Sequence, residues 1–310
     1  MSRIIKKLPI PIVGLMLGLA ATGNLVLSYG NAYRNIFGLF SAIILCLALI
    51  KIISYPKNVR DDLNNPVVAS VFPTLSMGIM LLATYLIPYS KSLSFGMWLI
   101  GIIFHLLLII NFTKKYVINF DIKKVFPSWF VVYVGIVVSS VTAPTFNMAG
   151  VGKVAFWFGF ICYLVLLPIV LYKVLKVGNI PEPALPTLVI FSAPASLCLT
   201  GYMNAFQEKN MAMVYILLIL SQITYLLVLL TLPKLLKLKF YPSYSAFTFP
   251  LVISAISLKV TNGFLVNAGN PIALLKYLAK FEELFAVIMV IYVLLRYINF
   301  LFNHSETVKG

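Results

Sequence analysis

The sequence contains few acidic residues and few of the side chains that bind metals. Eight of its 310 residues are aspartate or glutamate, and it has two histidines and three cysteines. Cys46, Cys162 and Cys198 fall in separate apolar segments, so we expect small buried side chains rather than disulfides or metal ligands. The sequence shows no glycine-rich phosphate loop and no nucleophile with a base beside it. It therefore predicts no catalytic residues, no metal and no cofactor, and we do not expect an enzyme.

Apolar residues, in contrast, are abundant. Hydrophobic side chains make up 61% of the chain, charged ones make up 10%, and the mean hydropathy is +1.01. A soluble domain of this length would need a more polar surface. Apolar segments of about 20 residues, long enough to cross a bilayer, recur along the whole chain. We predict an all-α integral membrane protein with a single transmembrane domain over residues 1–310, and ten spans at about 9–29, 33–54, 66–87, 92–112, 126–147, 151–173, 184–206, 211–232, 243–264 and 280–302.

Lysines and arginines are distributed unevenly between the two sides of such a bundle. Seventeen of the 24 lie before the first span or after an even-numbered span, and six lie in the opposite loops. Cytoplasmic loops are the ones enriched in basic residues. We therefore expect a cell-membrane protein with both termini in the cytoplasm, and no nucleic-acid partner despite the net charge of +16. The first span runs to full length without a clear cleavage site, so we expect no cleavable signal peptide.

Prolines recur at the start of the odd-numbered spans, 56 to 61 residues apart, at Pro9, Pro66, Pro127, Pro183 and Pro242. Proline is tolerated there because the first N–H groups of a helix have no intrahelical partner. A second helix breaker follows within each odd span, whereas Pro168 is the one mid-span proline of the even spans. We predict five helical hairpin repeats around a central pore, with kinked odd helices inside and even helices outside. The predicted kinks in the pore wall lie at Gly14, Gly18, Pro73, Gly135, Pro194 and Pro250.

The odd spans also carry hydroxyl side chains. Thr74, Ser139, Ser196 and Thr248 are candidates for a weakly polar pore lining. The alternative is that they hydrogen-bond to carbonyls of their own helices, as they do in any bundle. All eight acidic residues are expected in loops or at span ends. This distribution weakens coupled cation transport, because proton-coupled carriers usually hold a carboxylate at membrane depth.

Two ionisable residues are predicted inside spans. His105 lies in the fourth span, where we expect a neutral imidazole hydrogen-bonded to a neighbour. Lys259 lies near the outer end of the ninth span. Its side chain either reaches the membrane interface or attracts anions toward the pore, and the sequence leaves both roles open.

Five motifs follow one another on the odd spans: PIPIVGLMLGLAA at 9–21, NPVVASVFPTLSMG at 65–78, FPSWF at 126–130, FSAPASLCLTGY at 191–202 and SAFTFPLVISA at 245–255. In this order they resemble the tellurite-resistance/dicarboxylate transporter family, and the resemblance covers nearly the whole chain. That family includes bacterial TehA-type proteins, a yeast malate permease and the slow anion channels of plant guard cells.

The resemblance implies ten spans in five hairpins and a homotrimer with a separate pore in each protomer. It also implies that a phenylalanine on the ninth helix occludes the pore. The matching residue is Phe249, directly before Pro250, and Phe247 is the alternative if the register slips by two. The implied function is an anion channel or channel-like permease for small inorganic or organic anions. The alternative is a secondary carrier for C4-dicarboxylates such as malate, for sulfite or for tellurite-related anions.

Overall fold

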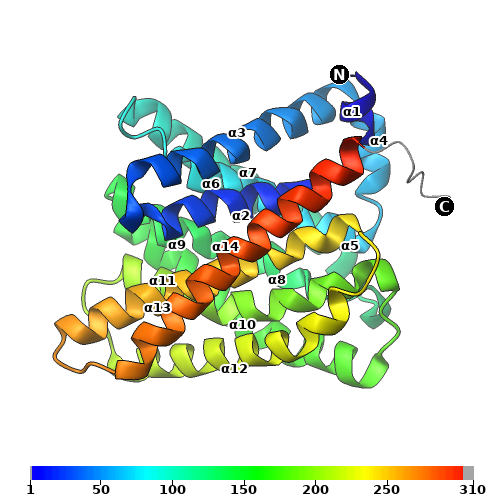
Figure 1. Ribbon diagram of the computed structural model, residues 1–310. Helices are drawn as coiled ribbons and strands as arrows, with labels where there is room; N and C mark the ends of the chain where they lie inside the picture. The colour runs from blue at the N-terminus through cyan, green and yellow to red at the C-terminus, as the bar shows by residue number, and fades with distance from the viewer. Residues whose placement is uncertain (1, 303–310) are drawn as a thin grey trace.

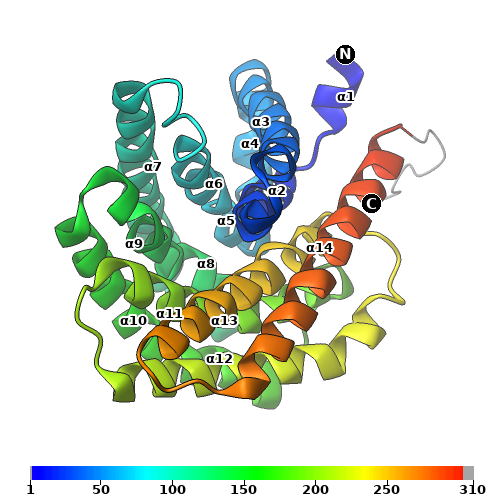
Figure 2. The same cartoon turned by 60° about the vertical axis from the view of Figure 1, so that its left-hand side comes forward.

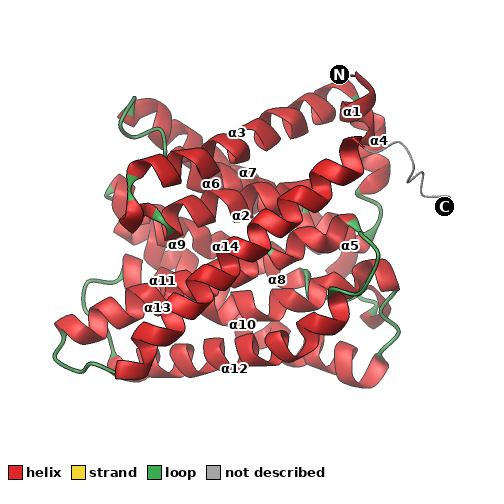
Figure 3. Cartoon of the chain, in the orientation of Figure 1, coloured by secondary structure: helices red, strands yellow, loops and turns green. Residues whose placement is uncertain are grey.

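The structure is a computed structural model in which residues 2–302 are described, with side chains from residue 4 onward. These residues form helices and no strands, which confirms the all-α prediction (Figure 3). Eight helical segments are long and apolar enough to cross a membrane. Two shorter apolar helical segments, Ile12–Leu25 and Gly135–Phe146, lie where the first and fifth spans are predicted. The chain is therefore a multi-pass membrane protein, while the count of ten spans stays a prediction.

Five long helices form the outside of the bundle, and between 28% and 33% of the residues in their apolar spans are buried. Exposed apolar side chains such as Leu39, Ile103 and Leu230 cover their outward faces, as a lipid environment requires. Short π-helical segments, η2 (Thr113–Val117) and η6 (Lys173–Val177), extend two of them. The five helices are α3 (Asn31–Ser54), α7 (Lys91–Phe112), α10 (Ala149–Tyr172), α12 (Met211–Leu235) and α14 (Ala273–Phe302) (Figure 1).

The inner segments are shorter and mostly broken into two or more pieces. They are α2 (Ile12–Leu25); α5 (Pro66–Val71) with α6 (Thr74–Ala83); α8 (Trp129–Tyr133) with η4 (Gly135–Val137), α9 (Val138–Thr142) and η5 (Ala143–Phe146); η7 (Glu182–Ser192) with α11 (Ala193–Ala205); and η8 (Pro242–Phe247) with α13 (Phe249–Asn267). The connecting pieces are α1 (Ser2–Lys7), η1 (Leu27–Tyr29), α4 (Pro56–Asp62) and η3 (Ile122–Lys124).

The inner helices close into a ring. In sequence order α2 contacts α6, α6 contacts α9, α9 contacts α11, α11 contacts α13, and α13 returns to α2. Each inner helix also contacts the outer helix that follows it in the chain. The three inner segments long enough to count as spans have between 61% and 83% of their residues buried. This arrangement supports an inner and an outer wall, and the hairpin repeat itself stays a prediction.

Four inner segments change their helical path at or beside a proposed kink. The chain turns between α5 and α6, and it tightens into a 3₁₀ turn after α8. Both α11 and α13 begin with a proline in their first turn, directly after a 3₁₀ segment. The residues concerned are Pro73, Gly135, Pro194 and Pro250. The first inner segment differs, because α2 runs without a break through Gly14 and Gly18, and the chain turns before it, at residues 9–11.

Gly14 and Gly18 have another use, which is close packing. A Cβ atom on Gly14 would lie 2.9 Å from the Cβ of Ser245, and one on Gly18 would overlap Oγ1 of Thr248. The same Thr248 hydroxyl donates a hydrogen bond to the carbonyl of Gly14 over 3.2 Å. The two glycines therefore let α2 lie directly against the start of α13.

Glu282 and Glu283 lie farther inside their helix than the sequence predicts, while their position at the end of a span stays a prediction. The tenth span is predicted from about residue 280, but α14 begins at Ala273. Glu282 therefore lies about two and a half turns inside the helix. Its side chain is 1% exposed and that of Glu283 is 7% exposed. The helix thus carries two carboxyl groups into the packed bundle.

Both ends of the described chain lie at the same end of the bundle, in both views (Figures 1 and 2). Helix α1 contacts α14, and Lys7 Nζ donates a hydrogen bond to the carbonyl of Phe300 over 2.6 Å. We call this end of the bundle the terminal face and the opposite end the far face. Because all five inner segments start at the terminal face, their N-terminal ends share one direction.

Candidate functional site

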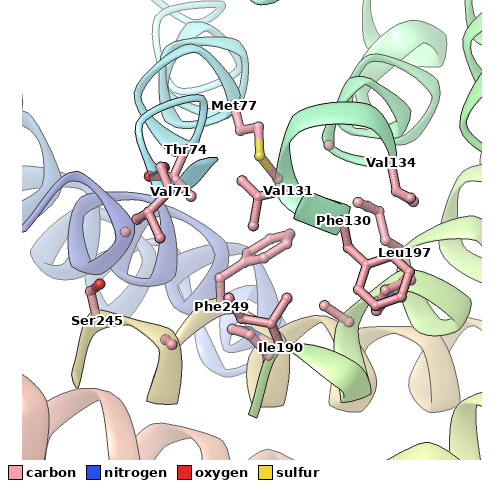
Figure 4. Close-up of a pocket in the computed structure, with 16 residues that line it drawn as sticks. Val71, Thr74, Met77, Phe130, Val131, Val134, Ile190, Leu197, Ser245 and Phe249 are labelled. Atoms are coloured by element: carbon pink, nitrogen blue, oxygen red, sulfur yellow. Dashed lines mark hydrogen bonds between the residues drawn. The ribbon is translucent and has the colours of Figure 1, made fainter. Parts of the chain in front are cut away.

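A small cavity lies at the centre of the inner ring (Figure 4). Its volume is about 40 Å³, and apolar side chains such as Val71, Phe130, Val131 and Ile190 make up most of its wall. A cavity needs about 10–15 Å³ of such volume to hold one water. The cavity therefore has room for a few waters in this conformation.

Four inner helices begin at the wall of this central cavity. Gly14 is the third residue of α2, Thr74 is the first of α6, Ala193 is the first of α11 and Phe249 is the first of α13, and all four residues line the cavity. None of these four helix starts has a side-chain cap. Helix N-termini carry a partial positive charge. The first N–H groups of α2, α6 and α13 bond to carbonyls of the turn that precedes each helix. Among the described residues no acidic side chain lines this cavity, so the site favours an anion over a cation.

Phe249 stands between the central cavity and a second one toward the far face. The second cavity has a volume of about 90 Å³, and its wall includes Asn24, Leu81 and Ile253. Phe249 and Leu197 line both cavities. The ring of Phe249 points into the central cavity, toward Val131 (Figure 4). A path along the axis of the bundle would therefore have to pass this ring.

Phe247, the alternative gate residue, lies in a different environment. Its side chain is fully buried, and its ring centroid is 4.7 Å from that of Tyr244. It lines neither the central cavity nor the second one. The geometry of the two cavities thus favours Phe249 over Phe247 as the residue that interrupts the path.

The four candidate lining hydroxyls all donate to carbonyls of their own segments. Such bonds occupy carbonyls near breaks in a helix. Of the four residues, Thr74 lines the central cavity. The sequence-based alternative, bonding within the helix, describes the contacts of all four. The donor–acceptor pairs are Thr74 to Val71 at 2.8 Å, Ser139 to Ile136 at 2.7 Å, Ser196 to Ser192 at 2.8 Å, and Thr248 to Ser245 at 2.7 Å.

A wider vestibule opens at the terminal face. Its volume is about 690 Å³, and each of the five inner segments contributes a residue at or beside its starting proline: Pro9, Pro66, Phe126, Pro183 and Pro242. Lys6, Lys7 and Lys51 also line it, together with one acidic side chain among the described residues, Asp62. Lys51 Nζ lies 3.8 Å from the carboxylate of Asp62 and donates to the carbonyl of Leu8. The vestibule is therefore a predominantly basic mouth at which the starts of the inner segments meet.

His105 joins an outer helix to two inner ones. It is fully buried on α7, with Nδ1 2.8 Å from the Ser76 hydroxyl and Nε2 3.1 Å from the carbonyl of Val132. A Cβ atom on Gly135 would lie 2.9 Å from the imidazole Cε1. The imidazole is thus hydrogen-bonded to neighbours, as expected, and it supports the wall directly behind the central cavity.

Lys259 is held by three partners near the far face. Its Nζ donates to the carbonyl of Leu25 over 2.9 Å and to Ser28 Oγ over 2.8 Å, and it lies 3.1 Å from Glu283 Oε2. It therefore joins the end of α2 to α14, and the Glu283 carboxylate offsets its charge. The sequence showed the lysine but not this partner, 24 residues away on the next helix. The two roles considered from the sequence stay predictions.

An all-helical bundle with a buried inner ring and lipid-exposed outer helices defines a multi-pass membrane protein. The profile of the voltage-dependent anion channel family matches residues 7–298. The chain therefore belongs to this family, and the resemblance seen in the five odd-span motifs is confirmed. The family points to a channel or transporter for anions rather than to an enzyme.

Two curated proteins of Methanocaldococcus jannaschii are similar to this chain, and both are described as uncharacterized transporters. One is 26% identical over 186 residues and the other 24% identical over 189 residues. Each match covers 56% of this chain and 54% of the relative. The chain thus spans about half the length of the curated relatives it matches.

Proposed function

We propose that the protein is an anion channel or channel-like permease that passes small anions through a path inside each protomer, gated by Phe249. The observation that carries this proposal is the convergence of four uncapped helix starts on a central cavity without acidic side chains. The partial positive charge of a helix start stabilises an anion without a fixed counter-charge that would hold it tightly. Passage of an anion needs such weak binding.

The gate follows from the apolar wall of the central cavity. A narrow apolar segment excludes water, and a desolvated ion does not cross it. The ring of Phe249 separates the cavities of about 40 Å³ and about 90 Å³. A change of its χ1 rotamer would join them, and this motion needs no movement of the helices. Phe249 is therefore assigned as the gate and Phe247 as a packing residue beside it.

The vestibule and the central cavity have different roles in the proposed path. Lys6 and Lys7 give the vestibule a positive field, which raises the local concentration of anions. The central segment then selects by size and by the cost of removing water. The basic terminal face agrees with a cytoplasmic location of both termini, and the homotrimer implied by the family resemblance belongs to the same proposal.

The second candidate is a secondary carrier for C4-dicarboxylates, sulfite or tellurite-related anions. One observation favours it, namely the buried carboxyl group of Glu282, since coupled carriers use such groups at membrane depth. The small central cavity, with a volume of about 40 Å³, speaks against a large substrate in this conformation. The channel is therefore the first candidate.

Purified protein in planar bilayers tests the proposal. Currents are measured under chloride, nitrate, sulfite and malate gradients and under a proton gradient, with wild type beside Phe249→Ala. We expect reversal potentials that follow the anion gradient and unitary currents at channel rates. A reversal potential that follows protons, or turnover far below channel rates, would reject the channel hypothesis in favour of the carrier. The absence of anion movement in both proteins would reject both candidates.

A further inference from the structure

A group of polar side chains is buried between α12, α13 and α14, away from the central cavity. Glu282 of α14 is 1% exposed, and Ser254 of α13 is fully buried. Ser254 and Gln222 lie against the Glu282 carboxyl group, and Tyr225 lies near enough to interact with its charge. Within the described residues, Glu282 Oε2, Ser254 Oγ, Gln222 Nε2 and the Tyr225 hydroxyl have no hydrogen-bond partner. Three unpartnered polar atoms from α12 and α13 therefore lie around one carboxyl group of α14.

The charges around Glu282 do not balance if its carboxyl group is ionised. Lys259 is the lysine of α13, and its Nζ already pairs with Glu283 over 3.1 Å. Lys280 of α14 is exposed and donates to Tyr29. Beside the partly exposed Lys259–Glu283 pair, an ionised Glu282 has no cation partner among the described residues, and a buried unpaired charge is strongly unfavourable in a protein interior. A bound proton removes that charge.

The other elements packed against α14 bring no compensating cation to Glu282. Residues 12–25 of α2 include no titratable side chain. Segment η8 contributes Tyr244, whose hydroxyl donates to the carbonyl of Leu238. Helix α1 meets α14 at the terminal face, where Lys7 donates to Phe300. Tyr225 of α12 is a neutral phenol that can donate to either form of the carboxyl group.

The group lies directly behind the outer half of the proposed path. Ser254 is the neighbour in sequence of Ile253, which lines the second cavity together with Phe249. One helix, α13, therefore separates the carboxyl group from the path, and a helix with its side chains is about 10 Å across. A single negative charge at about 10 Å in a medium of intermediate dielectric constant lowers the local concentration of an anion by about tenfold.

We propose that Glu282 is a proton-binding site behind α13, and that its ionised form opposes the passage of anions. The proton exchanges between water and the carboxyl group, with Ser254, Gln222 and Tyr225 orienting it. The effect on flux rests on the proposed anion path, whereas proton binding itself does not. Flux is highest with the proton bound, and it falls as the pH rises and Glu282 ionises.

The flux test compares wild type, Glu282→Gln, Glu282→Asp and the control Glu208→Gln, which removes an exposed loop carboxylate, in proteoliposomes at a series of pH values. We expect the wild-type flux to fall about tenfold between its acid and alkaline limits, as does that of Glu208→Gln. Glu282→Gln should stay at the acid limit throughout, and Glu282→Asp should keep a pH dependence. A wild-type pH profile in Glu282→Gln overturns the proposal.

Infrared difference spectroscopy of the reconstituted protein tests proton binding without any transport. The wild type should show the C=O stretch of a protonated, buried carboxylic acid that disappears as the pH is raised. Glu282→Gln should lack this band, and Ser254→Ala should shift it, because Ser254 lies against the group. A band unchanged in Glu282→Gln, or no band in the wild type, rejects the site. If the wild type passes no anions yet shows the band, the proposed function fails and the proton site stands.

Discussion

Replacing Phe249 with alanine tests the gate most directly. The side chain is 6% exposed and packs in the wall between two cavities. Opening a wild-type path requires the ring to leave this packing, and burial of a phenylalanine contributes about 1.5–3 kcal/mol. Phe249→Ala lacks the ring, so its free-energy barrier to opening is lower by this burial energy. Since about 1.4 kcal/mol is a factor of ten in rate, we expect anion flux to rise between about tenfold and about a hundredfold.

The same substitution should lower stability only moderately. Phenylalanine-to-alanine changes in packed cores cost about 3–5 kcal/mol, and a ring that already borders empty space on two sides belongs at the lower end. The assay is chloride flux from proteoliposomes at matched protein density, with thermal unfolding in detergent measured in parallel. Phe247→Ala is the matched control, because its ring packs against Tyr244 away from both cavities.

We expect Phe247→Ala to lose at least as much stability as Phe249→Ala while its flux stays at the wild-type level. Unchanged flux in Phe249→Ala would refute the gate assignment. A higher flux in Phe247→Ala would instead identify Phe247 as the gate. Equal opening of both variants would show that loosening of the bundle, rather than removal of a gate, raises the flux.

Two further substitutions test the packing around the path. Gly18→Ala should cost about 1–3 kcal/mol, because the new Cβ would overlap Thr248 Oγ1 directly before the gate. Gly150→Ala, where no atom lies within 4 Å of the new Cβ, is the control. A lower midpoint of thermal unfolding is expected for the first variant alone, and equal midpoints would contradict the close packing. Glu283→Gln should raise anion flux from the far face about threefold at low salt, because Lys259 loses its counter-charge. The increase should disappear at high salt, where charges are screened. If the flux of Glu283→Gln does not depend on salt, Lys259 does not attract anions.

Proline acts locally, so the sequence alone indicates where a helical segment can break, and Pro194 and Pro250 were predicted as kinks on this ground. Pro194 and Pro250 each lie in the first turn of an inner helix, as their missing N–H groups require. The glycines of α2 were harder to interpret, since glycine serves both bending and close packing. Whether Gly18 bends the helix or receives Thr248 depends on a contact across more than 200 residues, which no local pattern contains.

The buried carboxyl groups were missed for a different reason. The start of α14 follows a proline and a loop, and its first turns are less apolar than the rest of the helix. Hydropathy therefore placed the boundary at about residue 280, beside Glu282 and Glu283. The partner of Glu283 is Lys259, which the sequence shows as an isolated charge within an apolar span. Ion pairs between helices become visible only when the helices are placed side by side.

The contrast between a vestibule of about 690 Å³ and a central cavity of about 40 Å³ has an electrical consequence. A wide, wet passage offers little resistance, so the membrane potential falls mainly across the narrow dry segment around Phe249. A unit charge that crosses 100 mV changes its free energy by about 2.3 kcal/mol, or about fiftyfold in rate. The permeating anion would itself sense the voltage at this point. Strong rectification would then follow from the shape of the lumen, without the movement of a charged helix.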